Sequence, residues 1–289
     1  MPYTSHQWLE TGTWFLYRGH RIFYRIESNG QPLILLHGFP TSSWDWHRLW
    51  DSLRNSYQLI ALDFIGYGFS DKPHNYTYSI DDQATLLEHL LAHLKIGTYH
   101  LLSHDVGDTV AQELLARQLD RSEHRILSVC LLNGGLFPET HRATVMQKLL
   151  LIRIGFIVAR LSTSKRFVAS FSILFPVATR PTVDEMRELY SLITYKSGTK
   201  IMHRLIKYII ERRENRSRWV GALQKANCPI RLIDGLEEPV SGKHMVERYR
   251  ELIPQADVAE LAGCGHYPQL EKPEDVLNKY AEFRKGILG

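Results

Sequence analysis

The chain has 289 residues, of which 44% are hydrophobic and 23% charged, and its formal net charge is +4. This is the composition of an ordinary globular protein, and the charge is too small to indicate a partner that is a nucleic acid. Three widely separated cysteines without a CxxC pair argue against a zinc ribbon or a disulfide scaffold. We find no stretch of the roughly 18–20 apolar residues that a membrane span needs and no signal-peptide pattern, so we expect a cytoplasmic protein.

Strands and helices alternate through the first half of the chain. Strands are predicted at residues 13–18, 21–27, 32–36, 57–63, 99–103 and 126–132. Helices are predicted around residues 44–53, at 79–95 and at 106–119, where apolar side chains recur with helical spacing. This alternation predicts an α/β protein with a mostly parallel sheet and helices on both faces.

The alternation stops at residue 136, and residues 136–226 show helical patterning without strands. We predict helices at 148–161, 183–195 and 200–213, forming a cap inserted after the sixth strand. Residues 1–135 and 227–289 then form one core domain, with the last two strands at 229–233 and 257–261. We expect the cap to be a lid over an apolar pocket, although helical packing away from any site is the alternative.

One acidic residue stands between a buried strand and a helix. Strand 99–103 stops at Ser103-His104, the helix begins directly afterwards, and Asp105 lies between them with Gly107 two places on. A side chain on such a sharp turn stands next to free backbone N–H groups at the helix N-terminus, which is typical of a nucleophile elbow. The alternative is that Asp105 is an ordinary helix N-cap.

Four segments in order carry a resemblance to a known family. They are His37-Gly38-Phe39-Pro40, the glycine-punctuated loop 63–70, the Asp105 elbow and Gly265-His266-Tyr267-Pro268. Together they resemble the α/β-hydrolase fold, specifically its group with an Asp nucleophile, the epoxide hydrolases and haloalkane dehalogenases. The resemblance extends from about residue 15 to 283, and it implies an eight-stranded sheet with an inserted helical cap.

The resemblance also implies roles for individual residues. Asp105 would be the nucleophile and His266 the base, with the backbone N–H groups of Phe39 and Val106 as the oxyanion hole. No cofactor and no metal are implied.

The acid partner of the histidine is where this sequence departs from the family. The family pattern Gly-x-x-Asp-Pro here reads Gly235-Leu236-Glu237-Glu238-Pro239. Glu238 fills the acid position and is our prediction for the third member of the triad. Asp234, one residue before the turn, is the competing candidate.

An Asp nucleophile narrows the chemistry. A carboxylate is already charged at neutral pH, so it can displace a leaving group from saturated carbon and form an alkyl ester that His266 and water then hydrolyse. Attack on an ordinary ester would give a mixed anhydride, which argues against an esterase or lipase. The substrate is expected to be small and apolar to moderately polar and to react with water. The protein is expected to be a monomer or a homodimer.

The leaving group separates the two subfamilies. A halide needs N–H donors in the pocket, and the side chains of Phe39 and Val106 cannot donate. An epoxide oxygen needs a proton donor, and the cap offers Tyr208, Tyr195 and Tyr190. We therefore favour epoxide hydrolysis to diols, with haloalkane dehalogenation as the alternative and a non-catalytic, ligand-binding homologue as the second alternative.

Two further charged features are interpreted from the sequence alone. Asp108 would raise the pKa of Asp105 if both faced the pocket, and otherwise it is a first-turn residue favoured by the helix dipole. The arginine-rich run 212–218 is interpreted as a solvated helix end.

Overall fold

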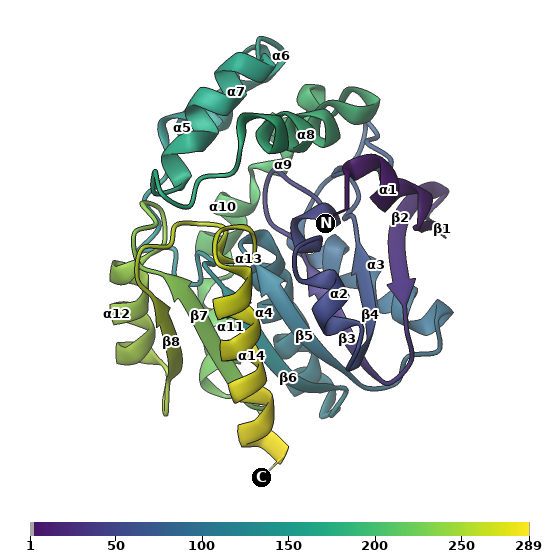
Figure 1. The fold of residues 1–289 in the computed structure, drawn as a ribbon, viewed down its shortest axis with the longest axis vertical. Helices are drawn as coiled ribbons and strands as arrows, with labels where there is room; N and C mark the ends of the chain where they lie inside the picture. Colours follow the sequence, from purple (N-terminus) through teal and green to yellow (C-terminus); the bar gives the residue numbers. More distant parts are fainter. Residues whose placement is uncertain (1–2, 289) are drawn as a thin grey trace.

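In the computed structural model, which describes residues 3–288, one sheet has the strand order β1-β2-β4-β3-β5-β6-β7-β8 (Figure 1). The strands are β1 (Thr13–Tyr17), β2 (His20–Glu27), β3 (Gln31–Leu36), β4 (Tyr57–Leu62), β5 (Tyr99–His104), β6 (Ile126–Leu132), β7 (Ile230–Gly235) and β8 (Asp257–Leu261). The β1–β2 and β2–β4 pairs are antiparallel and the remaining pairs are parallel. The mostly parallel eight-stranded sheet predicted from the sequence is confirmed.

Helices cover both faces of the sheet. Outside the segment between β6 and β7 they are α1 (Ser5–Glu10), α2 (Trp50–Leu53), α3 (Ile80–His93), α4 (Val106–Arg121), α12 (Lys243–Leu252), α13 (Pro268–Glu271) and α14 (Pro273–Leu288), and α11 (Arg216–Gln224) joins them from the end of that segment. In Figure 1, α2 and α14 lie in front of the sheet, and α3, α4 and α11 lie behind it. None of the helices in residues 3–288 has the length and apolar character that crossing a membrane requires.

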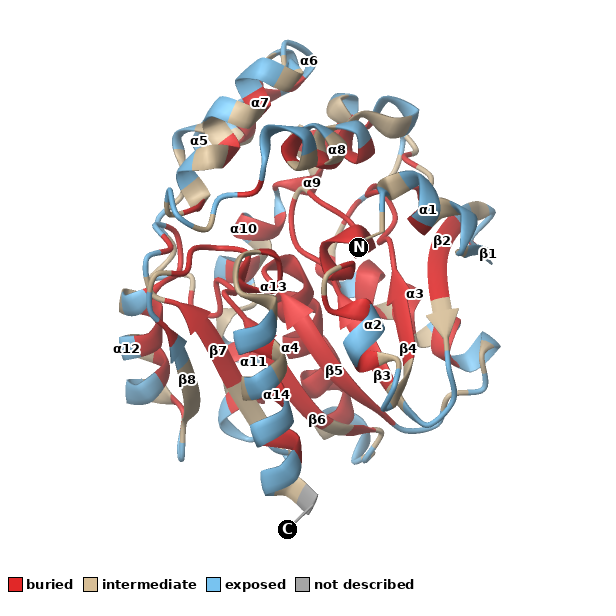
Figure 2. Ribbon diagram, in the orientation of Figure 1, coloured by how far each residue is buried: buried red, intermediate tan, exposed pale blue. Residues whose placement is uncertain are grey.

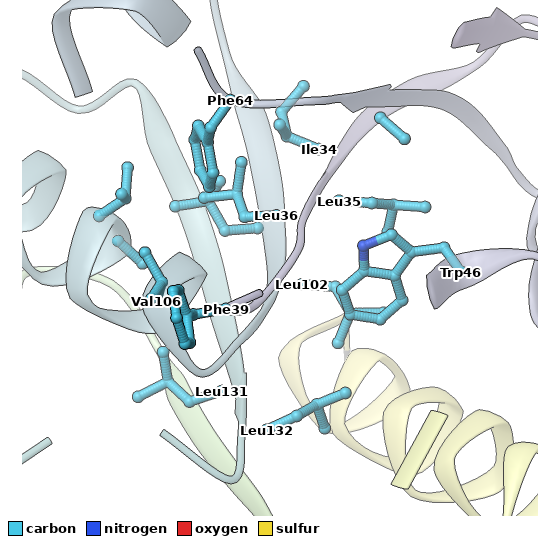
Figure 3. Packing of buried hydrophobic residues seen from close by; sticks show 14 of the residues in the cluster. Ile34, Leu35, Leu36, Phe39, Trp46, Phe64, Leu102, Val106, Leu131 and Leu132 are labelled. Carbon is cyan, nitrogen blue, oxygen red and sulfur yellow. The ribbon is translucent and has the colours of Figure 1, made fainter. Parts of the chain in front are cut away.

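The core lies along the central strands. All six residues of β5 are buried, and β3 and β6 are buried over most of their length (Figure 2). Strands covered on both faces read as continuous apolar runs, which explains why the sequence identified them. Figure 3 shows this packing, with Phe39 and Val106 beside Ile34, Leu35, Leu36, Leu102, Leu131 and Leu132. The core therefore fixes the backbone at the carboxyl ends of these strands.

The segment between β6 and β7, residues 136–226, is named the cap segment here. Its helices are α5 (Val145–Leu151), α6 (Gly155–Arg160), α7 (Ser164–Phe171), α8 (Val183–Thr194), α9 (Met202–Leu205) and α10 (Tyr208–Glu214), followed by α11. In Figure 1, α5 to α9 lie above the carboxyl ends of the strands, and α10 reaches down toward the sheet.

Three predicted helices are broken into shorter ones. Residues 44–53 form a 3-10 turn, η1 (Ser43–Trp46), and α2, while 148–161 divides into α5 and α6 and 200–213 into α9 and α10. At the break before α6 the chain turns back closely on itself, since a Cβ on Gly155 would lie 2.1 Å from the Leu150 carbonyl oxygen. Side-chain periodicity does not record such a turn, so the sequence predicted continuous helices.

Candidate active site

Asp105 stands at the junction of β5 and α4 with φ 47° and ψ −103°. A non-glycine residue in this region of backbone space is strained, and such strain is concentrated at functional sites. The turn needs the nearby glycine, because a Cβ on Gly107 would lie 2.5 Å from the Leu36 carbonyl oxygen of β3. The carboxylate accepts a hydrogen bond from the Phe39 backbone N–H at 3.0 Å, to Oδ2. The local backbone thus presents Asp105 as the sequence predicted.

His266 and Glu238 come together beside this carboxylate. His266 Nε2 lies 4.0 Å from Asp105 Oδ2, and Nδ1 lies 3.3 Å from Glu238 Oε1. Glu238 is itself held in place, since it accepts hydrogen bonds from the Val240 N–H at 2.7 Å and the Ser241 hydroxyl at 2.8 Å. The arrangement is an acid–histidine–carboxylate line in which one group orients the next.

Of the two acids that the sequence left open, Glu238 is the one that meets His266. Asp234 is fully buried at the end of β7, and neither of its carboxylate oxygens has a hydrogen-bond partner among the described residues. Burial, helped by the nearby Glu238 charge, raises the pKa of Asp234 well above its usual value.

The charges of the site depend on one another. Burial by itself raises the pKa of Asp105, but the Arg212 guanidinium and His266 outweigh it and leave that pKa below its usual value. Burial by itself lowers the pKa of His266, but the Glu238 and Asp105 carboxylates outweigh it and leave that pKa above its usual value. At neutral pH Asp105 is therefore a charged carboxylate.

Arg212 of α10 forms a buried ion pair with Asp105. Its side chain is 2% exposed, and Nη2 donates to Asp105 Oδ1 at 3.2 Å and to the Asp105 carbonyl at 3.0 Å. Nε donates to the Thr109 hydroxyl at 2.8 Å, and the guanidinium lies 4.6 Å from the centre of the Tyr208 ring. Nη1 is buried and has no hydrogen-bond partner among the described residues.

A cavity of about 280 Å³ extends from this site into the cap segment. Phe39 and His266 of the site line it together with Leu161 and Arg166 of the cap segment. Most of the remaining lining is apolar, including Leu150, Phe167 and Phe171. Such a lining suits an apolar substrate with a few polar groups at the reacting end.

The comparisons with known proteins agree with this fold and geometry. A family model described as the alpha/beta hydrolase fold matches residues 31–273. The chain belongs to the α/β-hydrolase family. It is 43% identical to the mesoderm-specific transcript homolog protein of Bos taurus over 291 aligned positions, covering 96% of this chain and 87% of that protein.

Two solved structures share this fold. An epoxide hydrolase, CorEH, superposes on this α/β-hydrolase with a TM-score of 0.76 at 20% identity, covering 96% of this chain and 99% of the other. A haloalkane dehalogenase, DatA from Agrobacterium tumefaciens C58, superposes with a TM-score of 0.80 at 18% identity, covering 96% of each chain. At such identities the likeness shows the shared fold.

The three cap tyrosines of this α/β-hydrolase lie in different surroundings. Tyr208 is 2% exposed, its ring centre is 5.7 Å from that of Phe39, and its hydroxyl has no hydrogen-bond partner among the described residues. The Tyr190 hydroxyl donates to the Ser162 carbonyl at 2.9 Å. Tyr195 packs on Phe69, with a 5.3 Å separation of ring centres. Of the three, Tyr208 is the one brought to the Arg212–Asp105 pair.

The oxyanion-hole candidates flank the same carboxylate. The Phe39 N–H already contacts Asp105 Oδ2. Val106 is the first residue of α4, so its N–H has no acceptor within the helix. Both N–H groups are therefore directed by backbone geometry that the core holds in place.

Asp108 lies in the first turn of α4, as one of the two interpretations from the sequence had it. It is fully buried and accepts a hydrogen bond from the Ser103 hydroxyl at 2.5 Å. Burial raises its pKa well above the usual value. The expectation that Asp108 raises the pKa of Asp105 is not met, since that pKa lies below its usual value.

The interpretation of residues 212–218 as a solvated helix end is wrong for Arg212. Arg213 and Arg218 are exposed, but the helix turns Arg212 inward together with Tyr208 and Ile209. The spacing of four between Tyr208 and Arg212 was the available signal, because residues four apart share one helix face.

No group of His, Cys, Asp and Glu within residues 3–288 is arranged to hold a metal ion. His104 contacts the His266 carbonyl through Nε2 at 2.7 Å. His100 contacts the Ser128 hydroxyl at 2.8 Å. Each of these histidines has a structural partner.

Proposed function

We propose that this α/β-hydrolase opens epoxides to diols through an alkyl ester on Asp105, with residues 136–226 acting as the lid. The observation that carries the proposal is the charged Asp105 carboxylate at a strained elbow, with Arg212 on Oδ1 and the Phe39 N–H on Oδ2. A buried carboxylate kept ionised beneath an apolar cavity is suited to attack saturated carbon.

In the first step Asp105 Oδ1 attacks a ring carbon, while Oδ2 stays on the Phe39 N–H, where the oxyanion of the second step forms. The carbon–oxygen bond of the ring breaks, and its electron pair passes to the ring oxygen, which takes a proton from the Tyr208 hydroxyl. Burial raises the pKa of Tyr208, so this phenol is protonated and ready to donate. The resulting phenolate lies against the Arg212 guanidinium, which stabilises its charge.

The ion pair supports this step in a second way. As Oδ1 changes from a carboxylate to an ester oxygen, it loses the charge that holds Arg212. The guanidinium then faces the negative charge that has moved toward the ring oxygen and Tyr208. Arg212 thus interacts with the transferred charge throughout, which is the kind of preorganised electrostatic support that lowers a barrier.

In the second step His266 takes a proton from water, and the hydroxide attacks the Asp105 ester carbonyl. The 4.0 Å from Nε2 to Oδ2 exceeds hydrogen-bonding distance, which leaves Nε2 free to receive that proton. The N–H groups of Phe39 and Val106 stabilise the oxyanion, and Glu238 stabilises the imidazolium. Collapse of the intermediate expels the diol alkoxide, which takes the proton back from His266. Asp105 is left as a carboxylic acid, and its proton passes to the Tyr208 phenolate, which restores the charged carboxylate and the neutral phenol.

Haloalkane dehalogenation is the second candidate. The side chains of Phe39 and Val106 cannot donate to a halide, but Arg212 Nη1 is a buried donor without a partner. That donor is the observation that favours this chemistry. The first step would then release halide rather than an alkoxide, and Tyr208 would transfer no proton.

A product assay tests the proposal and separates the candidates. The protein is incubated with styrene oxide and with 1-bromobutane, and diol and bromide are quantified. We expect diol from styrene oxide, and no turnover by Asp105→Ala. Bromide without diol would favour the second candidate. Neither product from a folded protein would contradict both and favour a ligand-binding homologue.

A further inference from the structure

The charge of the cap segment is one-sided. Residues 140–183 contain no Asp or Glu and seven Lys or Arg residues: Arg142, Lys148, Arg153, Arg160, Lys165, Arg166 and Arg180. Outside this stretch, acidic residues outnumber basic ones. The modest net charge of the whole chain therefore conceals a strongly basic segment.

The same segment carries most of the exposed apolar surface. Seven of the twelve exposed large apolar side chains of the described residues fall within positions 145–161: Val145, Leu149, Ile152, Ile154, Phe156, Ile157 and Leu161. They belong to α5, α6 and the turns beside them, at the end of the molecule farthest from the sheet (Figure 1). Figure 2 shows this end mainly as exposed and half-buried residues. Apolar side chains gathered in this way mark an interaction surface.

The cations among these apolar residues have no carboxylate partner. Lys148, Arg153, Arg160, Lys165 and Arg166 are all exposed, and none forms an ion pair within residues 3–288. Elsewhere on the surface, cations such as Arg216 and Arg248 are paired with Glu139. We name residues 142–166 the basic apolar tip. Its charges are available to an external anionic partner.

This surface adjoins the active-site cavity. Val158, Leu161 and Arg166 belong to the basic apolar tip and also line the cavity. His266 and Phe39, which lie beside Asp105, line the same cavity. The tip and the surroundings of Asp105 therefore share one mostly apolar cavity, which an apolar molecule from a lipid layer could enter.

We propose that the basic apolar tip docks on a membrane surface that carries anionic lipid headgroups, and that the apolar substrate is taken from that layer. Interleaved apolar and basic side chains are the pattern of an interfacial segment, in which the apolar groups enter the headgroup boundary and the cations contact anionic lipid. A second copy of this chain is a less favourable partner for the tip, because docking two tips together would bring two sets of unpaired cations close to each other. The proposed docking does not depend on the proposed function, whereas the proposed source of the substrate rests on it.

Vesicle sedimentation tests the docking without any turnover. The full chain is mixed with phosphatidylcholine vesicles, with and without phosphatidylserine, at low and high salt. We expect binding to the phosphatidylserine vesicles at low salt, weakened by salt, and little binding to phosphatidylcholine alone. Equal binding to both vesicles, or no binding to either, would overturn the proposal.

Matched variants locate the surface. We expect the pair Ile154→Ser and Phe156→Ser, and separately the pair Arg153→Glu and Arg160→Glu, to weaken partitioning by about tenfold or more. The controls are Leu16→Ser, which alters another exposed apolar side chain, and Lys225→Glu with Lys285→Glu, which removes charge elsewhere.

Two further measurements distinguish a failure of the proposed membrane docking from a failure of the proposed reaction. Turnover of water-dissolved styrene oxide should be unchanged in the tip variants, because none of the substituted side chains lines the cavity. Light scattering reports the oligomeric state in the same samples. A dimer that the tip variants dissociate, together with absent vesicle binding, would overturn the proposal in favour of self-association.

Discussion

At the scale of single residues, the site is organised by the ion pair between Asp105 and Arg212. Both side chains are buried, so each charge would be costly without the other. The pair keeps the pKa of Asp105 low while the free Nη1 donor stays available. Arg212 is thus both a structural partner of Asp105 and part of the proposed chemistry.

The ion pair predicts a strong coupling in a double-mutant cycle. We expect Arg212→Met to lower the free energy of unfolding by about 3–5 kcal/mol at pH 7, because it leaves the Asp105 charge buried and alone. Adding Asp105→Asn should restore part of that loss. Urea unfolding measures the free energy of unfolding of the single and the double variant. If the effects of the two substitutions were additive, a direct ion pair would be contradicted. Arg213→Met, at an exposed arginine, is the control.

The Glu238–His266 contact predicts a shift in pH dependence. The carboxylate raises the pKa of His266, and the base must be neutral to accept a proton from water, so the rate falls as the pH drops through that pKa. Glu238→Gln removes the carboxylate and lowers the pKa of His266. We expect a lower kcat whose acidic limb moves to lower pH, while the exposed Glu237→Gln leaves the limb in place. An acidic limb that stayed at the same pH, or moved to higher pH, in Glu238→Gln would contradict this contact.

Tyr208 offers a substitution that separates chemistry from packing. Its hydroxyl has no hydrogen-bond partner among the described residues, so Tyr208→Phe should leave the unfolding free energy nearly unchanged. We expect kcat for epoxide opening to fall by about 10²-fold, the usual contribution of one positioned proton donor. Tyr195→Phe should retain activity, since Tyr195 packs on Phe69. An equal loss in both variants would argue against Tyr208 as the donor.

At the scale of elements, the sequence predicted best where a local pattern decides the structure. The predicted bounds of β6 and β8 agree with those observed, because continuous apolar runs fix them. The breaks between α5 and α6 and between α9 and α10 were missed, because side-chain spacing does not show how the backbone packs. Arg212 was missed for the same reason, because only the packing of α10 shows that the side chain turns inward.

Two glycines test how elements approach one another. Gly107 lies in the first turn of α4, where a Cβ would meet the Leu36 backbone, whereas a Cβ on Gly221 in α11 has no atom within 4 Å. We expect Gly107→Ala to destabilise the protein by about 1–3 kcal/mol through overpacking. Gly221→Ala should stabilise it by up to about 1 kcal/mol through helix propensity. Chemical denaturation measures both, and similar effects at the two sites would contradict the close approach of α4 to β3.

At the scale of the whole molecule, the site is assembled from two parts of the chain. The strand ends of the sheet carry Asp105, Glu238 and His266, and these were predictable because ordered motifs mark the loops that follow the strands. The cap segment contributes Arg212 and Tyr208 and carries the cavity outward to the basic apolar tip. That contribution depends on how a helical segment packs over a sheet, which no single motif encodes.

The most direct test of this account is to trap the alkyl ester on Asp105. His266→Gln removes the base while leaving the nucleophile, so the first step proceeds and the second stops. After incubation with styrene oxide, intact-mass measurement should show one adduct with the mass of the epoxide, and peptide mapping should assign it to Asp105. Diol formation by the unaltered protein, without an adduct on Asp105 in His266→Gln, would contradict a covalent mechanism.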